Sequence, residues 1–221
     1  IIIKTTVNGS DVNKVEKASE PYYATFLDSN GNKLVSGQAE FNINGIFYKR
    51  NIIDGVSKLN LNLGVGTYII TAKNPLTNEM TSNKIIIRQR FANNSNVVKY
   101  YRNDTQYYIT LLGDDGKPVG ANEIVTFNIN GVMYERKTNE NGTAKMNINL
   151  NPGDYIITAM YKGCMISNNI KVLPIIKAKD ITMTYRDGTR FTAALLDGKG
   201  IPYLNQTIIF NINGVFYHRT T

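Results

Sequence analysis

The sequence predicts an all-β protein made of tandem antiparallel β-sandwich domains. Three observations support this fold class: a repeated decapeptide, a strict alternation of apolar and polar residues, and regularly spaced Asn-Gly turns. The decapeptide is FNINGIFYKR at 41–50, FNINGVMYER at 127–136 and FNINGVFYHR at 210–219, so its copies begin 86 and 83 residues apart. A period of about 85 residues is long enough for a small independent domain, whereas solenoid units of roughly 20–50 residues are not.

The repeat extends beyond the decapeptide and sets the domain organisation. A second pair of segments also aligns, LNLNLGVGTYIITAKN at 59–74 with MNINLNPGDYIITAMY at 146–161. The alignment divides the chain into a last strand of a preceding repeat at 1–3, two complete repeats at 4–90 and 91–174, and the N-terminal half of a third repeat at 175–221. The linkers RQRF and VLPIIK between these units are short, and the fixed φ of Pro174 favours a stiff second junction.

Alternation of residue type identifies the strands. In the second repeat Met146, Ile148 and Leu150 alternate with polar residues, and Leu59, Leu61 and Leu63 do so in the first. A period of two places the aliphatic side chains on one buried face. Counting such segments gives about seven strands in each complete repeat, which is typical of an antiparallel sandwich.

The Asn-Gly step inside FNING predicts a tight hairpin. A type I′ turn needs positive φ at both central residues, which Asn and Gly tolerate. We therefore expect Asn130 and Gly131 to reverse the chain between two paired strands, and Gly131 not to tolerate Val.

Tyr68 and Tyr155 each begin a YIIT segment directly after a glycine-containing turn. A tyrosine at such a corner can hydrogen-bond back to the turn, as in immunoglobulin-type sandwiches. The alternative is a tyrosine that simply fills the core, and the residues alone leave both interpretations open.

Composition excludes several function classes. One cysteine, Cys164, rules out an intrachain disulfide and every cysteine-based metal motif, and one histidine, His218, has no partner for a histidine pair. No apolar run approaches the roughly 20 residues of a membrane-spanning helix. The formal net charge of +8 is spread along the chain without a basic block. The sequence offers no nucleophile motif and no phosphate loop, so we expect neither an enzyme nor a cofactor, and no nucleic-acid partner.

The run TFNINGVMYERKTNENGTAKMNINLNPGDYIITA resembles the bacterial immunoglobulin-like repeats of invasin and intimin type. It is more similar still to the tandem repeats of adhesin-like surface proteins of methanogenic archaea. The resemblance covers nearly the whole chain and implies tandem immunoglobulin-like domains in a non-catalytic protein at the cell surface. The first repeat departs from the pattern, with NIIDGVSKLNLNL where the second has KTNENGTAKMNINL.

Two kinds of covalent modification have candidate residues. Surface repeat domains sometimes form a Lys-to-Asn isopeptide bond between first and last strands, and Lys99 with Asn168 or Asn169 is the candidate pair. Five Asn-x-Ser/Thr sequons occur, about as many as the high asparagine content gives by chance. Asn103 and Asn141 lie in turns that would accept a glycan.

Acidic turns raise the question of calcium. DSNGN around Asp28 and GDDGK around Asp114 and Asp115 lack the twelve-residue loop with its terminal Glu. Asp, Asn and Gly are also the ordinary residues of turns, and we favour this interpretation. No metal site is predicted.

Two functions follow from these observations. The first is a structural stalk of rigid repeats that projects from a cell surface or assembles into an extended surface structure. The alternative is an adhesive module whose sandwich-end loops contact a host protein, a glycan or an acidic wall polymer. An unfinished sheet at 175–221 would expose apolar IIFNI, so we expect it to be poorly ordered or covered by another copy of the chain or a neighbouring repeat.

Overall fold

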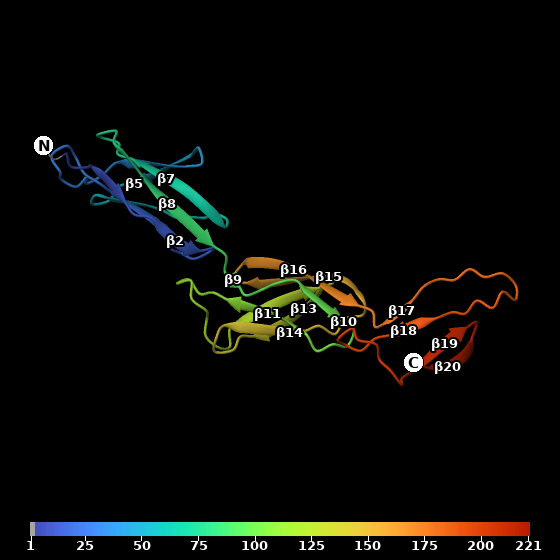
Figure 1. Cartoon of the computed structure of the whole chain (residues 1–221). Coiled ribbons are helices and arrows are strands. Elements are labelled where there is room, and N and C mark those ends of the chain that lie inside the picture. The colour runs from blue at the N-terminus through green and yellow to red at the C-terminus, as the bar shows by residue number, and fades with distance from the viewer. Residues whose placement is uncertain (1–2) are drawn as a thin grey trace.

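The computed structural model describes residues 3–221, and every regular element in that range is a β-strand. The chain folds into three units that follow one another in chain order (Figure 1). The predicted strand at 1–3 falls largely outside the described residues, and Ile3 itself is exposed and outside any strand.

The first domain is a sandwich of two sheets. The smaller sheet has the order β1-β3-β6 and the larger sheet the order β2-β8-β7-β4-β5. The strands are β1 (Val7–Gly9), β2 (Val12–Val15), β3 (Tyr22–Phe26), β4 (Gln38–Ile43), β5 (Ile46–Asn51), β6 (Val56–Leu59), β7 (Gly66–Lys73) and β8 (Met80–Arg88).

The second domain repeats this topology strand for strand. Its smaller sheet has the order β14-β11-β9 and its larger sheet the order β10-β16-β15-β12-β13. The strands are β9 (Phe91–Ala92), β10 (Val97–Tyr100), β11 (Gln106–Leu111), β12 (Ile124–Ile129), β13 (Val132–Lys137), β14 (Thr143–Asn147), β15 (Gly153–Tyr161) and β16 (Cys164–Leu173). This arrangement, with sequential strands distributed between two facing sheets, is immunoglobulin-like, as the sequence predicted.

The structure adds two details to the expected seven antiparallel strands. Each complete domain has an eighth, short strand, β1 or β9, at the edge of the smaller sheet. Each also has one parallel pair, β2 with β8 and β10 with β16, because the first segment of the domain crosses to the larger sheet and runs beside the last.

The predicted alternation forms the core. Leu59 and Leu61 in the first domain and Met146 and Ile148 in the second are all buried. An aromatic pair lies at the centre of each sandwich: Tyr22–Phe41 and Tyr107–Phe127 pack edge to face with ring centroids 5.8 Å apart.

The repeated decapeptide is a hairpin in all three units. Asn130 and Gly131 have φ of 53° and 80°, as a type I′ turn requires, and β12 pairs with β13 around them. The other asparagine of the motif, Asn128, accepts a hydrogen bond from the Gly131 N–H at 3.0 Å. Asn42 and Asn211 do the same for Gly45 and Gly214 at 3.1 and 2.9 Å. Three residues of each FNING therefore build the turn, and Phe and Ile of the first two copies fill the core.

The third unit consists of two hairpins. Its strands are β17 (Ile176–Ala178) paired with β18 (Ala193–Leu195), and β19 (Thr207–Ile212) paired with β20 (Val215–Thr220). Phe191 and Phe210 repeat the edge-to-face pair of the complete domains at 5.7 Å. A surface cavity of about 600 Å³ adjoins them, and Phe191 is 45% exposed. Apolar side chains that are core in the first two units thus face solvent in the third.

Candidate functional site at the domain junctions

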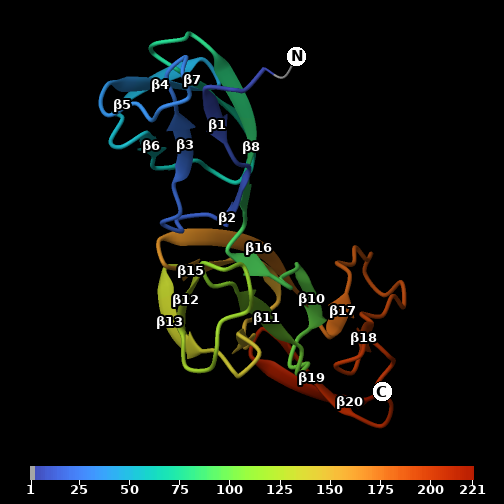
Figure 2. The same cartoon turned by 90° about the vertical axis from the view of Figure 1, so that its left-hand side faces the viewer.

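The first junction is only two residues long. Strand β8 of the first domain ends at Arg88, and strand β9 of the second begins at Phe91, which leaves Gln89 and Arg90 between them. Figure 2 shows the end of β2 and β8 lying against the second domain. So short a link keeps the two domains close together. The contacts around the link then determine how firmly the domains are fixed relative to each other.

Arg90 is buried and bonds to both domains. Its guanidinium donates from Nε and Nη2 to the Glu16 carbonyl oxygen at 3.2 and 2.7 Å. On the other side, Nη1 donates to the Leu112 carbonyl at 3.2 Å and Nη2 to Asp114 Oδ1 at 2.8 Å. The side chain is 1% exposed, so the planar, always charged guanidinium is held by fixed acceptors rather than by water. Arg90 therefore acts as a clamp between the domains.

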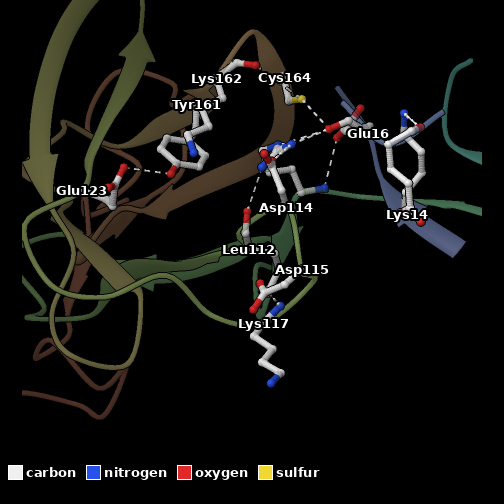
Figure 3. A network of polar contacts seen from close by, with 12 residues as sticks. Lys14, Glu16, Leu112, Asp114, Asp115, Lys117, Glu123, Tyr161, Lys162 and Cys164 are labelled. Atoms are coloured by element: carbon white, nitrogen blue, oxygen red, sulfur yellow. Dashed lines mark hydrogen bonds and ion pairs between the residues drawn. The ribbon is translucent and has the colours of Figure 1, made fainter. Parts of the chain in front are cut away.

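Backbone bonds and a second loop reinforce the clamp. The Arg90 N–H donates to Glu16 Oε1 at 3.1 Å, and the Leu112 N–H donates to the Arg90 carbonyl at 2.8 Å. From the β15–β16 turn, Cys164 Sγ approaches the Glu16 carbonyl at 3.8 Å. Figure 3 shows Glu16 opposite Asp114 and Cys164. The Glu16 carbonyl oxygen of the first domain thus contacts both the link, through Arg90, and the second domain, through Cys164.

Cys164 is buried at this junction, and burial raises the pKa of its thiol above the usual range. A thiol is a nucleophile only as its thiolate, so the structure is consistent with an inert cysteine that packs as a small apolar group.

A buried lysine supports the junction-facing loop in each domain. Lys14 donates to the carbonyls of Glu20 and Leu61 at 3.0 and 3.2 Å. In the second domain Lys99 donates to the Ile148 carbonyl at 2.8 Å, to that of Thr105 at 3.4 Å and to that of Asn103. Desolvation lowers the pKa of both ammonium groups, and nearby carboxylates partly offset this by favouring the charged form. Lys14 thus joins the loop before β3 to the segment after β6. Lys99 likewise joins the loop before β11 to the segment after β14.

The second junction has the same layout with different chemistry. The Leu196 N–H donates to the Ile175 carbonyl at 2.7 Å, as Leu112 does to Arg90, so Ile175 occupies the position of the arginine. Gly200 lies so close to Tyr100 that a Cβ there would be 2.3 Å from the ring. Lys177 Nζ lies 6.0 Å from the centroid of the same ring. An aromatic contact thus replaces the guanidinium clamp.

The structure does not bring the isopeptide candidates together. Lys99 is opposite Val172 in the β10–β16 register, and its ammonium is directed to the three carbonyls described above. Asn168 Oδ1 instead accepts a hydrogen bond from the Tyr107 hydroxyl at 2.7 Å, and the Asn169 N–H donates to Asn96 at 2.8 Å. In this arrangement Lys99 and the asparagines have separate structural roles.

The two glycosylation candidates lie in different surroundings. Asn141 is exposed in the turn before β14. Asn103 lies at the second junction, where its Nδ2, the atom that would carry a glycan, donates to the Gly198 carbonyl at 2.5 Å. A glycan on Asn103 would therefore displace an interdomain hydrogen bond, whereas Asn141 is free of this conflict.

The acidic turns direct their carboxylates to backbone groups or to the clamp. Asp28 Oδ1 accepts from the N–H groups of Asn30 and Asn32 at 2.9 and 2.8 Å, and these bonds lower its pKa. Asp115 accepts from the Lys117 N–H at 3.0 Å, while Asp114 binds Arg90. Within residues 3–221 no group of three or more His, Cys, Asp or Glu side chains gathers.

The tyrosine corners are present in both complete domains. The Tyr68 hydroxyl donates to the Gly64 carbonyl at 3.0 Å and the Tyr155 hydroxyl to the Asn151 carbonyl at 2.9 Å. Both rings also pack against the core from the side. The hydrogen-bonded corner is therefore present in both domains, and the two rings border the core rather than fill it.

Sequence reasoning missed the clamp and the buried lysines, although signals existed. Lys14 and Lys99 stand two residues after the buried Val12 and Val97, on the inward parity of their strands. A lysine at a core position needs buried acceptors. Arg90 had a weaker signal, namely a charged residue where the next repeat has Ile175.

No protein-family model matches the sequence, and no curated protein does. Among solved structures, the I9–I11 tandem of titin is 13% identical with a TM-score of 0.43, covering 93% of this chain and 86% of that one. The D0–D1 domain of intimin is 17% identical with a TM-score of 0.31, covering 75% and 97%. Fibronectin type III-like modules of Clostridium thermocellum CbhA are 15% identical with a TM-score of 0.28, covering 76% and 94%. No helix within residues 3–221 is long and apolar enough to cross a bilayer.

Proposed function

We propose that this chain is a non-catalytic stalk segment of a surface protein, in which the repeats at 4–90 and 91–174 and the unit at 175–221 hold a more distant part away from the cell. The observation that carries the proposal is the buried Arg90 clamp across a two-residue link. A stalk resists bending only when its junctions are stiff, and a buried guanidinium with acceptors on both domains supplies such stiffness.

The loops at the junctions also favour a spacer over an end-loop binder. The turn that contains Asp114 and the segment around Glu16 are occupied by contacts between the first two domains. Asn103 and Tyr100 are likewise engaged with the third unit. Loops used in this way are not open to an external ligand, so the adhesive alternative has fewer free loops than the sequence suggested.

The proposed location is extracellular, at the cell surface, and it rests on the resemblance of the repeats to adhesin-like proteins. The expectation that another copy or a neighbouring repeat covers the third unit stays a prediction. The apolar surface around Phe191 and Phe210 supports this prediction. The mass of the chain in solution tests whether copies of the chain associate.

The stiffness of the first junction can be measured in the full chain. Spin labels at Lys49→Cys and Glu135→Cys lie on equivalent strands of the two domains, at exposed positions. We expect a narrow distance distribution by pulsed electron paramagnetic resonance, and a broad one after Arg90→Ala, because the Glu16 and Leu112 carbonyls lose their shared donor. The buried carbonyls left without a donor cost about 1–3 kcal/mol.

Arg190→Ala is the matched control, because it removes the same charge from an exposed position in the third unit. It should leave the distribution narrow. A broad distribution in the unsubstituted protein would show that the clamp does not hold the domains and would overturn the stalk proposal.

A further inference from the structure

A groove runs along the side of the first domain, beside β6. It has a volume of about 410 Å³ and is open to solvent. Tyr23 on β3, Arg50 and Asn51 on β5, Lys58 on β6 and Asn60 just after it line the groove, together with two aliphatic side chains. The walls are thus basic and amide-bearing, with one exposed aromatic ring.

The two cations of the groove have no acidic partner. Arg50 lies over the Tyr48 ring, 5.9 Å from its centroid, and donates one bond from Nη1 to the Lys49 carbonyl at 2.8 Å. This orients the guanidinium while leaving most of its N–H donors available. The ion pairs among residues 3–221 join Lys33, Arg90 and Lys171 to carboxylates, and neither Arg50 nor Lys58 is among them. An anion entering the groove would meet uncompensated positive charge.

These residues recur in the second domain, although other exposed charges on the strands change. Tyr23, Arg50, Lys58 and Asn60 correspond to Tyr108, Arg136, Lys145 and Asn147. The register is also the same, because Tyr23 is opposite Lys58 and Tyr108 opposite Lys145. By contrast, three lysines of the larger sheet are replaced, as Lys49 becomes Glu135, Lys73 becomes Met160 and Lys84 becomes Asn169. In the groove, Arg50 and Lys58 are retained as Arg136 and Lys145, although Asn51 becomes Lys137.

We propose that the groove beside β6 is a binding site for an acidic polysaccharide. The guanidinium and ammonium groups would bind the carboxylate or sulfate groups, and the asparagine amides would bind sugar hydroxyls. The Tyr23 ring, 54% exposed, offers an apolar surface to the C–H face of a sugar ring. This role goes beyond that of a spacer and does not depend on it.

Other polyanions fit the groove less well. A nucleic-acid strand stacks successive bases on several aromatic side chains, and this groove offers one ring. The backbone of an acidic peptide could also bond to the asparagine amides, but a peptide of acidic residues lacks the C–H face of a sugar ring that would pack on Tyr23. The formal net charge of +8 favours attraction of a polyanion to the chain as a whole, and the groove gives it a specific contact.

In the second domain, the equivalent tyrosine and asparagine already hydrogen-bond to a neighbouring glutamine. The Tyr108 hydroxyl donates to Gln106 Oε1 at 2.8 Å, and the Gln106 amide donates to Asn147 Oδ1. The first domain has Pro21 at the position of Gln106, so no such bridge forms there. We therefore expect the first-domain groove to be the stronger site.

Titration calorimetry of the full chain with a polygalacturonate oligosaccharide tests the proposal, with its methyl-esterified form as the uncharged ligand and dextran sulfate as the sulfated one. Lys58→Glu should weaken binding of a charged ligand about tenfold, as the loss of one well-placed ion pair and its replacement by repulsion imply. Lys84→Glu makes the same charge change on the larger sheet and should weaken binding less than about twofold.

Arg50→Gln provides a second variant, and its melting temperature shows whether the domain remains folded without the stack on Tyr48. Selective loss of binding in a folded variant supports the site. Three results would overturn the proposal: no binding of either charged polysaccharide, equal weakening by Lys58→Glu and Lys84→Glu, or equal binding of the esterified ligand. Tighter binding of polyglutamate or oligothymidylate than of both polysaccharides would also overturn it.

Discussion

At the scale of single residues, the repeated FNING motif and the turn before β14 show how backbone conformation selects residue type. Asn130 and Gly131 both have positive φ, and the space around Gly131 is open. Gly142 also has positive φ, 69°, but a Cβ there would lie 2.7 Å from the Val119 carbonyl oxygen and 2.8 Å from the Val119 nitrogen. Gly131 is therefore required only because its φ is positive. Gly142 is required both for its positive φ and because a side chain would collide with the backbone of Val119.

This difference predicts unequal costs for the same substitution. Gly131→Ala should lower the free energy of unfolding of the second domain by about 1 kcal/mol, because only the left-handed conformation is strained. Gly142→Ala should lower it by about 3 kcal/mol or more, since the backbone of Val119 must also move. Calorimetric melting of both variants measures the difference, and equal melting temperatures would contradict it.

At the scale of elements, the buried lysines compensate for strands that end early. Pairing of β14 with β11 ends at Asn147, yet the apolar alternation continues to the buried Ile148. Its carbonyl therefore lies in the interior without a neighbouring strand, and the Lys99 ammonium becomes its donor at 2.8 Å. The sequence predicted the strand and its inward face. It did not predict the lysine, because the Ile148 carbonyl that accepts its hydrogen bond is 49 residues away.

Lys99→Met tests this role, because methionine keeps the length of the side chain without its donors. We expect the second domain to lose about 1–3 kcal/mol of stability, since the cost of buried carbonyls without donors exceeds the relief of desolvation at the ammonium. Lys145→Met, at an exposed position on β14, is the control and should change stability by less than about 0.5 kcal/mol. A melting temperature raised by Lys99→Met would show that desolvation dominates.

At the scale of the whole molecule, the repeats share a layout at both junctions while their chemistry differs. A buried guanidinium holds the first junction, and a tyrosine ring against a glycine holds the second. The complete domains also share buried tyrosines: Tyr22 and Tyr107 donate to Asn83 and Asn168 at 2.6 and 2.7 Å. Both domains are therefore exposed to the same destabilising condition, which is high pH.

Alkaline unfolding follows from these tyrosines. Burial raises the pKa of Tyr22, Tyr107 and Tyr161 to about 12, from an ordinary value of 10.0. Between these values the unfolded chain gives up protons that the native state keeps, so stability is complete below pH 10 and is lost as pH rises from 10 to 12. Tyrosinate absorbance should show a late-titrating group that coincides with loss of circular dichroism.

Two conservative variants check the assignment of the late-titrating tyrosines. Tyr107→Phe and Tyr161→Phe each remove the hydroxyl of one buried tyrosine, and each should reduce the late absorbance. Titration of all 14 tyrosines near pH 10 with the fold intact would contradict the prediction.

The sequence by itself determined the strands, the hairpin turns and the inward faces, because each depends on alternation or on turn residues within about ten positions of one another. It also determined the tandem repetition, because the same decapeptide recurs at spacings of 86 and 83 residues. Only the tertiary structure determined the parallel pairing of β2 with β8, the Arg90 clamp and the groove beside β6. Arg90 takes its acceptors from Glu16, Leu112 and Asp114, and no local pattern relates these residues. Folding buries carbonyl groups from distant segments beside one another, and buried carbonyls need hydrogen-bond donors. Arg90 and Lys99 are the donors because the fold places their cationic groups next to these carbonyls.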